Sequence, residues 1–295
     1  MKKVILLFAF SVFFFAGCKA RQPDPYRNGI KILAIGNSYT ENSMLYLSDM
    51  LRQLGVTGNI TLVNAFISGG TLKDHAEHAR ANQSTKLQRR TFLAGGGQTS
   101  ATGITLLQMI QQEAWDVITL QQASMESGAS STYNADLDYL IDYVRKNATN
   151  KNFKLGWHMT WAWADGISYY NGTYGNQDKM YQAICTAVQT KIVPELKTGV
   201  FDFIIPTGTA IQNYRVHGDH LNHDGTHLSN LGCYIAATMW VKTITGYDIS
   251  KLTTPYVANK TWGGAPSVTI NATDLPDIIQ AVNAAAKSPF AVTPP

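Results

Sequence analysis

One stretch near the start of the chain contains a strand and the turn after it: Ile30-Lys31-Ile32-Leu33-Ala34-Ile35-Gly36-Asn37-Ser38. An apolar run of this length, ended by glycine, is typical of a strand that is covered on both faces of its sheet. Gly36 permits a tight backbone turn, and Ser38 then stands at the expected start of a helix. The stretch predicts a strand–turn–helix unit that presents a hydroxyl at the turn.

Strand-like runs alternate with helical patterns along the rest of the chain. Further strands are expected at 60–66, 115–120, 153–158 and 201–205. Helices are expected at 42–54, 71–81, 104–113, 134–146, 177–195, 230–243 and 275–286, and a Gly-rich loop at 91–102. Strands that are separated by helices pair in parallel through right-handed crossovers. We therefore predict an α/β protein, a three-layer α/β/α sandwich with a mainly parallel five-stranded sheet, in a single domain over 29–295.

The first residues have the pattern of a secretion signal. Lys2 and Lys3 precede the apolar run 4–15, which is too short for a comfortable membrane span. The run ends in Ala16-Gly17-Cys18, which resembles a bacterial lipobox, and this resemblance implies cleavage before Cys18 and lipidation of its thiol. We expect a signal peptide at 1–17, a lipidated tether at 18–28, and a lipid-anchored protein of the bacterial cell envelope, on its periplasmic or surface face.

Composition excludes one class of partner. The chain has 295 residues, 45% of them hydrophobic and 15% charged, with a formal charge of +4. Loss of Lys2 and Lys3 with the signal would leave 4 − 2 = +2, which gives no basis for nucleic-acid binding. Cys185 and Cys233 lie in helix-like apolar stretches, so free buried thiols are expected. A disulfide between them is the alternative.

Polar and glycine residues follow the predicted strands, where a parallel sheet places its active site. Gly69 and Gly70 come after the second strand, and their backbone can approach a substrate oxygen closely. Gln121 and Gln122 come after the third, and a side-chain amide there can donate a hydrogen bond to a developing oxyanion. Because adjacent side chains on a strand point opposite ways, only one glutamine is expected to do so.

The clearest chemical signal is Asp224-Gly225-Thr226-His227 before a late helix. A serine nucleophile needs a general base, and the base needs a carboxylate that orients it. Asp224 and His227 are three residues apart, so one loop can present both to Ser38. His220 and His223 are rival bases. Together with Asp224 and His227 they also suggest a metal, but no matching ligand cluster occurs elsewhere, and we expect no metal and no cofactor.

These motifs resemble those of the SGNH (GDSL-like) hydrolases. Gly36-Asn37-Ser38 is similar to their Gly-Asp-Ser block, the glycines after the second strand to their second block, and Asp224-Gly-Thr-His227 to their final Asp-x-x-His block. The resemblance implies a flavodoxin-like fold, a triad of Ser38, Asp224 and His227, and an oxyanion hole of the Ser38 N–H, Gly69 or Gly70, and a side-chain amide. The third block departs from the pattern, because Gln121-Gln122-Ala123 replaces Gly-x-Asn.

More narrowly, the chain resembles a group of bacterial lipoproteins with an SGNH-like domain of unassigned activity. The resemblance extends from Lys31 to about Gly246. It rests on four stretches: Trp115-Asp-Val-Ile-Thr-Leu-Gln-Gln, Met159-Thr-Trp-Ala, Ile205-Pro-Thr-Gly-Thr-Ala-Ile-Gln and Asp224-Gly-Thr-His-Leu-Ser.

Aromatic residues after the fourth strand suggest a substrate. Trp161 and Trp163, with Trp157, Tyr169 and Tyr170 nearby, suit the faces of sugar rings, although they could equally belong to the core. We therefore expect a serine esterase that cleaves carboxylic esters and removes acetyl groups from a glycan. The alternatives are a glycan-binding lipoprotein on a degenerate hydrolase scaffold, and a lipase or thioesterase with the same triad. Residues that precede the catalytic loop are also placed near the pocket by position alone: Asn213, Arg215 and Asp219.

Overall fold

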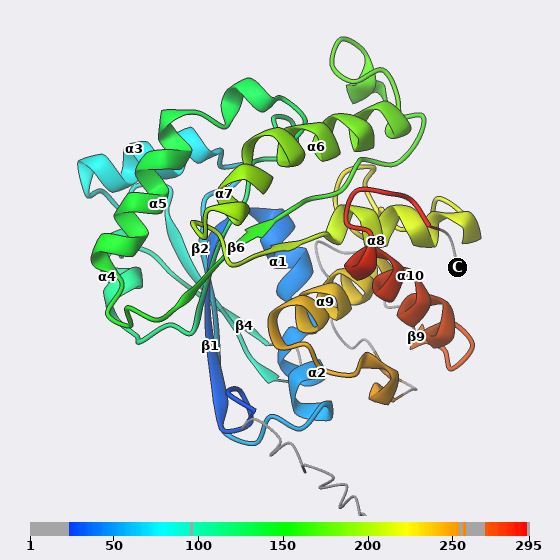
Figure 1. Ribbon diagram of the computed structural model, residues 1–295, viewed down its shortest axis with the longest axis horizontal. Helices are drawn as coiled ribbons and strands as arrows, with labels where there is room; N and C mark the ends of the chain where they lie inside the picture. Colours follow the sequence, from blue (N-terminus) through cyan, green and yellow to red (C-terminus); the bar gives the residue numbers. More distant parts are fainter. Residues whose placement is uncertain (1–23, 95–96, 254–255, 258–268, 294–295) are drawn as a thin grey trace, which may run out of the picture.

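The structure is a computed structural model that describes residues 24–94, 97–253, 256–257 and 269–293. Its centre is a seven-stranded sheet in the order β4-β3-β2-β1-β5-β6-β7 (Figure 1). The strands are β1 (Gly29–Gly36), β2 (Asn59–Phe66), β3 (Gln88–Phe92), β4 (Gln98–Ala101), β5 (Val117–Leu120), β6 (Lys154–His158) and β7 (Phe203–Ile205). The five strands β2-β1-β5-β6-β7 are parallel and correspond to the five that the apolar runs predict.

The prediction of a five-stranded sheet is wrong, because an antiparallel hairpin extends one edge. β3 pairs with β2 and β4 pairs with β3, both antiparallel, partly within the expected loop 91–102. Phe92 is the only buried residue of β3, and all of β4 is exposed. An edge hairpin that faces water carries no apolar run for sequence reasoning to detect.

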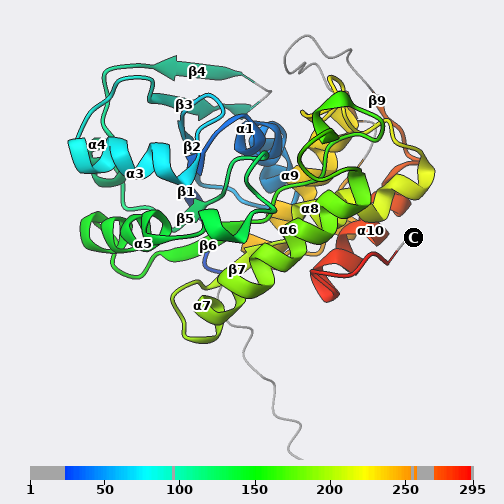
Figure 2. The ribbon, with the colours of Figure 1, turned by 90° about the horizontal axis from the view of Figure 1, so that it is seen from above.

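Helices cover both faces of the sheet. They are α1 (Ser38–Met44), α2 (Leu47–Gln53), α3 (Leu72–Ala81), α4 (Leu106–Gln111), α5 (Ala135–Asn147), α6 (Gln177–Lys191), α7 (Val193–Lys197), α8 (Thr207–Tyr214), α9 (Asn230–Thr245) and α10 (Leu275–Lys287). In Figures 1 and 2, α3, α4 and α5 lie on one side of β1, and α1, α2 and α9 lie on the other. This is the layered α/β arrangement that the alternating pattern predicts. Short elements complete the described chain: the 3₁₀ turns Ser130–Thr132, Ser168–Tyr170, Arg215–His217 and Ile249–Lys251, and the small sheet of β8 (Tyr256–Val257) and β9 (Thr269–Ile270).

Two expected helices are divided, and one helix was not expected. The helix expected at 42–54 is α1 and α2, and the helix expected at 177–195 is α6 and α7, with Pro194 in the first turn of α7. Every residue of α8 is buried, so its sequence lacks the alternation of polar and apolar faces that marks a surface helix.

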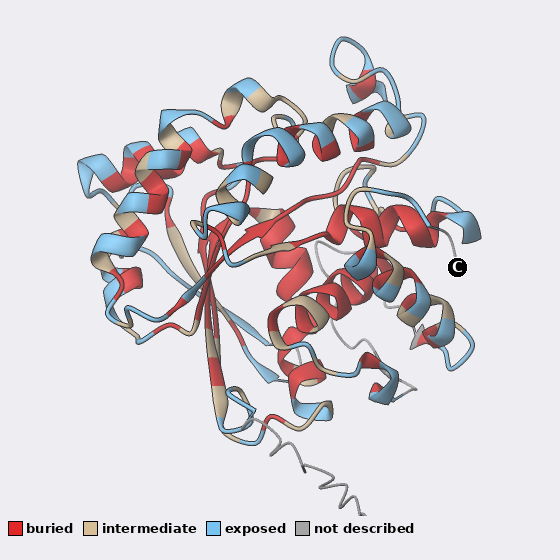
Figure 3. Ribbon diagram, viewed as in Figure 1, coloured by how far each residue is buried: buried red, intermediate tan, exposed pale blue. Residues whose placement is uncertain are grey.

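The core continues from the sheet into α9, as the burial colouring of Figure 3 shows. α9 packs against α1, α2, α8 and α10, so it is buried on nearly all sides. α10 contacts α8 and α9, and the Asn213 side chain in α8 donates to the Ala281 carbonyl in α10 (3.0 Å). The C-terminal segment therefore covers the helices that precede and follow the loop 215–229, which contains Asp224 and His227.

The expected tether is in part attached to the domain. The Thr57 N–H donates to the Arg27 carbonyl (2.9 Å), and the Tyr247 hydroxyl donates to Asp24 (2.7 Å). The expected signal 1–17 and Cys18 lie outside the described residues. Across the described ranges from 24 to 293, no helix combines the length and apolarity needed to cross a bilayer. Both remaining cysteines are free and buried, which confirms the expectation for Cys185 and Cys233.

Candidate active site

Ser38 is the first residue of α1, directly beyond the carboxyl end of β1. Gly36 is needed here because a side chain would run into Thr40 and Gln121. Asn37 caps the helix, since its Oδ1 accepts from the Tyr39 N–H (3.0 Å). The tight strand end and the capped helix together place the half-buried Ser38 hydroxyl at the edge of the sheet.

The Asn that replaces the usual Asp before the serine has a structural reason. Asn37 Nδ2 donates to the Gly70 carbonyl (3.1 Å), which an ionised carboxylate cannot do. Its Oδ1 accepts from Gln121 Nε2 (2.7 Å). Asn37 therefore links the nucleophile turn to the loop after β2 and to the end of β5.

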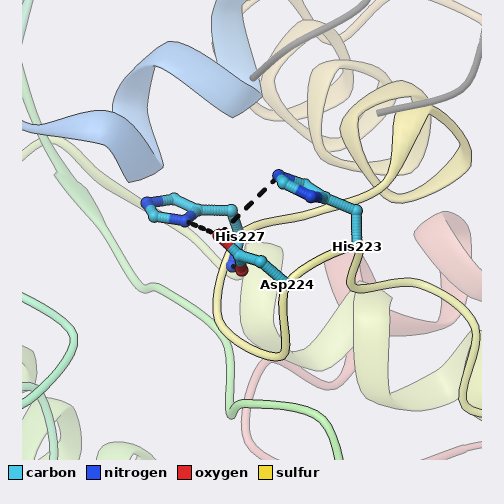
Figure 4. A group of neighbouring side chains, drawn as sticks. All are labelled: His223, Asp224 and His227. Carbon is cyan, nitrogen blue, oxygen red and sulfur yellow. Dashed lines mark hydrogen bonds and ion pairs between the residues drawn. The ribbon is translucent and has the colours of Figure 1, made fainter. Parts of the chain in front are cut away.

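The structure brings the three predicted triad residues together. His227 Nε2 lies 2.8 Å from Ser38 Oγ, and His227 Nδ1 lies 2.6 Å from Asp224 Oδ2. Figure 4 shows the Asp224 carboxylate between the rings of His227 and His223. With Nδ1 protonated and bonded to the carboxylate, Nε2 is able to accept a proton from Ser38 Oγ. His220 is exposed and lies outside this group.

Hydrogen bonds within the Asp224 loop fix its conformation. Asp224 Oδ1 accepts from the His227 N–H (2.7 Å), the Thr226 N–H (2.9 Å) and the Thr226 hydroxyl (3.0 Å). Gly225 has a φ of +88°, a left-handed conformation that favours glycine, and a Cβ there would lie 2.8 Å from Ile167 Cγ2. Partial burial raises the pKa of Asp224, but the hydrogen bonds from His227 and Thr226 outweigh it and hold the pKa well below its usual range. Asp224 is therefore ionised and able to orient His227.

Three donors meet on the carbonyl just before His227. The Thr226 carbonyl accepts from the Tyr39 hydroxyl (2.9 Å), Trp161 Nε1 (3.0 Å) and Asn222 Nδ2 (3.1 Å). Burial raises the pKa of Tyr39, so its hydroxyl stays protonated and can donate. This carbonyl fixes the backbone that carries His227. Sequence reasoning missed the roles of Tyr39 and Asn222, and the position of Tyr39 directly after Ser38 is the one signal that could have found it.

The oxyanion assignments are corrected in part. Gly69 lines the cavity beside Ser38, whereas the Gly70 N–H donates to the Ile67 carbonyl (3.0 Å). Gln121 and Gln122 are both buried and neither lines the cavity. Gln121 is engaged with Asn37, and Gln122 Nε2 donates to the Thr132 hydroxyl (2.9 Å). Both amides therefore support the strand end, and Ser38 and Gly69 remain as candidate donors.

Two buried histidines lie in this supporting layer. His158 Nδ1 is 2.9 Å from Gln121 Oε1, and His75 Nε2 is 3.1 Å from the Gly36 carbonyl. Burial lowers the pKa of His158 to about 3. Burial likewise lowers the pKa of His75 to about 4, against the opposing effect of its bond to Gly36. Both side chains are therefore neutral near pH 7 and act as part of the scaffold.

A cavity of about 650 Å³ opens over Ser38. Its walls come from the start of α1, the loops after β2, β5 and β6, and the catalytic loop. The lining residues are Asn37, Ser38, Tyr39, Ser68, Gly69, Thr71, Ala123, Ser124, Met125, Glu126, Trp163, Tyr169, Thr173, Thr226 and His227. The space is of the size that small-molecule sites commonly have.

The expected aromatic substrate site is only partly formed. Trp163 and Tyr169 line the cavity, and Tyr169 is 63% exposed. Trp161 is fully buried and stacks on Tyr39 with ring centroids 4.1 Å apart, so its expected contact with substrate is wrong. Trp157 and Tyr170 are also buried.

The residues placed near the pocket by position alone do not line it. The buried Arg215 donates to the Ala162 carbonyl (2.8 Å) and to Asn222 Oδ1 (2.9 Å), and it pairs with Asp219. Asn213 is buried against α10. Arg215 therefore supports the loop that carries Asp224 and His227, through Asn222 and the Thr226 carbonyl.

A mainly parallel sheet with a serine after its first strand, and an Asp-x-x-His loop before a late helix, is the arrangement that the resemblance to SGNH hydrolases implies. The chain belongs to the DUF4886 family, described as a domain of unknown function, which it matches over residues 31–274.

A solved structure of the same family resembles this chain, and two others resemble it more distantly. A DUF4886 family protein from Bacteroides uniformis is 32% identical, with a TM-score of 0.76, over 90% of this chain and 97% of that one. A candidate SGNH hydrolase from Slackia heliotrinireducens is 22% identical, with a TM-score of 0.49, over 74% of this chain and 100% of that one. A GDSL-like lipase from Bacteroides thetaiotaomicron is 12% identical, with a TM-score of 0.41, over 76% and 90%. No match was found among curated proteins.

Proposed function

We propose that this protein is a serine esterase with Ser38 as nucleophile, His227 as general base and acid, and Asp224 as the orienting carboxylate. One observation carries the proposal: the hydrogen-bonded line from Ser38 Oγ through His227 to Asp224, at the wall of a cavity of about 650 Å³. Proximity of nucleophile, base and carboxylate is what acyl transfer requires.

In the proposed reaction, Ser38 Oγ bonds to the ester carbonyl carbon while its proton passes to His227 Nε2. The N–H groups of Ser38 and Gly69 stabilise the negative oxygen. Removal of one such donor typically costs about 3–4 kcal/mol of transition-state stabilisation. Collapse breaks the bond to the alcohol, which takes the proton from His227. Water then attacks the acyl-serine by the same route, which releases the acid and restores Ser38.

We propose an acetylated glycan as the substrate. Tyr169 and Trp163 at the cavity wall support this choice, because exposed aromatic faces pack well against sugar rings. Met125, which is 68% exposed at the same wall, would equally suit a longer acyl chain, as in a lipase or thioesterase. A preference for p-nitrophenyl octanoate over the acetate would replace the acetyl proposal with that alternative.

The test is hydrolysis of p-nitrophenyl acetate by the full chain in mild detergent, beside Ser38→Ala and His227→Ala. We expect each variant to lose at least about 10³-fold in kcat. Ser100→Ala in exposed β4 and His217→Ala are matched controls that should keep full activity. If Ser38→Ala and His227→Ala both kept wild-type activity, the mechanism would be contradicted. Should the wild type be inactive and also fail to react with a serine-directed phosphonate, a glycan-binding protein becomes the better assignment.

We also propose action at the cell envelope, through lipid on Cys18. The support is the sequence alone: a basic start, an apolar run and small residues before the cysteine. Labelling of the wild type but not of Cys18→Ala by a fatty-acid probe in a bacterial host tests it.

A further inference from the structure

A second histidine, His223, lies close to the Asp224 carboxylate. His223 Nε2 lies 3.8 Å from Asp224 Oδ2, the same oxygen that is 2.6 Å from His227 Nδ1 (Figure 4). One potential ligand atom from each of these three residues lies within 4.8 Å of the others. The two imidazole rings face each other, with centroids 6.2 Å apart and planes 23° apart.

The backbone holds this cluster in place. The His223 N–H donates to the His227 carbonyl (3.0 Å), and Asn222 and Leu228 form an antiparallel bridge beside them. The two histidines therefore lie opposite each other across a closed turn, with Asp224 between them. Because Asp224 Oδ1 is already bonded to the backbone of the turn, Oδ2 is the oxygen that faces both rings.

Two imidazole nitrogens and one carboxylate oxygen form a donor set that suits zinc. Zinc bonds to such atoms at about 2.0–2.2 Å in tetrahedral geometry, which separates neighbouring ligands by roughly 3.3 Å. The two distances to Asp224 Oδ2, 2.6 and 3.8 Å, lie on either side of that value, so shifts of less than about 1 Å would bring each nitrogen to that separation from the oxygen. The Asp224 side chain is 40% exposed, which leaves access for the ion and a position for water. Magnesium and calcium favour sites made of oxygen atoms, so they should bind far less well.

We propose that Zn²⁺, or a divalent cation of similar chemistry, binds His223 Nε2, Asp224 Oδ2 and His227 Nδ1 and thereby inhibits the Ser38 site. An ion on Nδ1 takes the place of the proton there, and neutral imidazole then carries its one proton on Nε2. That nitrogen faces Ser38 and can no longer accept the serine proton. The ion also takes the Asp224 oxygen that orients the ring. It acts as a reversible inhibitor, so hydrolysis itself still needs no metal.

The inhibition rests on the proposed esterase function, but the binding does not, and the experiment separates them. Calorimetric titration of the metal-stripped full chain with ZnCl₂ in mild detergent should give one ion per chain. His223→Ala should weaken binding at least about 10-fold, and Asp224→Asn should weaken it too, which serves as a second variant if the first misfolds. His220→Ala, an exposed histidine three residues away, is the matched control and should stay within about twofold of wild type.

In parallel, the p-nitrophenyl acetate rate of each protein is measured with and without ZnCl₂, relative to its own zinc-free rate. We expect zinc to inhibit wild type and His220→Ala, chelator to restore both, and His223→Ala to need at least about 10-fold more zinc. Zinc binding that is unchanged in His223→Ala, or is matched by MgCl₂, would overturn the inference. Zinc binding as expected in a protein without esterase activity would instead overturn the proposed function and leave the metal site standing.

Discussion

Replacement of Asp224 by asparagine tests the separate roles of the two carboxylate oxygens, Oδ1 and Oδ2. Oδ1 accepts three hydrogen bonds within the turn, and Oδ2 accepts the one from His227 Nδ1. Asparagine has only one side-chain oxygen. That oxygen accepts more hydrogen bonds when it occupies the Oδ1 position in the turn. Its NH₂ group then faces His227 and can donate only to an unprotonated Nδ1.

The asparagine variant therefore holds His227 with its proton on Nε2, directed at Ser38. In this tautomer His227 cannot act as the general base. Substitution of this kind in a serine triad lowers kcat by about 10⁴-fold, which corresponds to about 5 kcal/mol of transition-state stabilisation. Because Asp224 does not line the cavity, KM should change little, and the loss should appear in kcat.

The assay is steady-state hydrolysis of p-nitrophenyl acetate, with thermal unfolding of the same samples. Asp165→Asn, an exposed carboxylate outside the triad, is the matched control and should keep wild-type kcat. A kcat for Asp224→Asn within about tenfold of wild type would refute the orienting role. A loss of kcat that accompanies unfolding would assign Asp224 to the stability of the loop instead.

Two further predictions concern the scaffold around the triad. Gly225→Ala should lower kcat at least about 10-fold, because the new Cβ would clash with Ile167 and displace the loop that carries His227. Gly172→Ala is the control and should keep its activity, because Gly172 has a similar φ of +85° but no atom within 4 Å of a new Cβ. Equal kcat losses in both variants would show that the clash with Ile167 is unimportant. Acid should also destabilise the protein, because His75 and His158 have pKa values of about 4 and 3 when folded and an ordinary value near 6.5 when unfolded, so the unfolded state binds more protons below pH 6.5. Their contribution to the free energy of unfolding should fall by about 2 kcal/mol between pH 6 and pH 5, at about 1.4 kcal/mol per proton per pH unit, and urea titrations showing equal stability at the two pH values would contradict it.

The parallel core of the fold could be predicted from local pattern. The five buried strands are continuous apolar runs, and the helices between them leave parallel pairing as the way to connect neighbours. The β3–β4 hairpin and α8 could not be predicted in this way. One is polar because it lies at the sheet edge, and the other is buried on every side, so neither carries the periodicity that identifies a strand or a helix.

The same division applies to the site. Ser38, Asp224 and His227 could be selected from sequence, because the strand-end serine and the Asp-x-x-His loop resemble two motifs of the SGNH hydrolases and together supply a nucleophile, a base and a carboxylate. The glutamines could not be assigned, since an amide at a strand end can point toward the cavity or toward the layer behind it. Here the Gln121 amide donates to Asn37, and the Gln122 amide donates to Thr132.

The sequence by itself determined the layered α/β class and singled out Ser38, Asp224 and His227, because strand periodicity and short motifs are encoded within a few neighbouring residues. Tertiary structure alone decided that Tyr39, Trp161 and Asn222 meet on the Thr226 carbonyl, and that Trp161 lies in the core while Tyr169 lies at the cavity. These contacts join residues up to 187 positions apart, and which of them form depends on how whole elements pack.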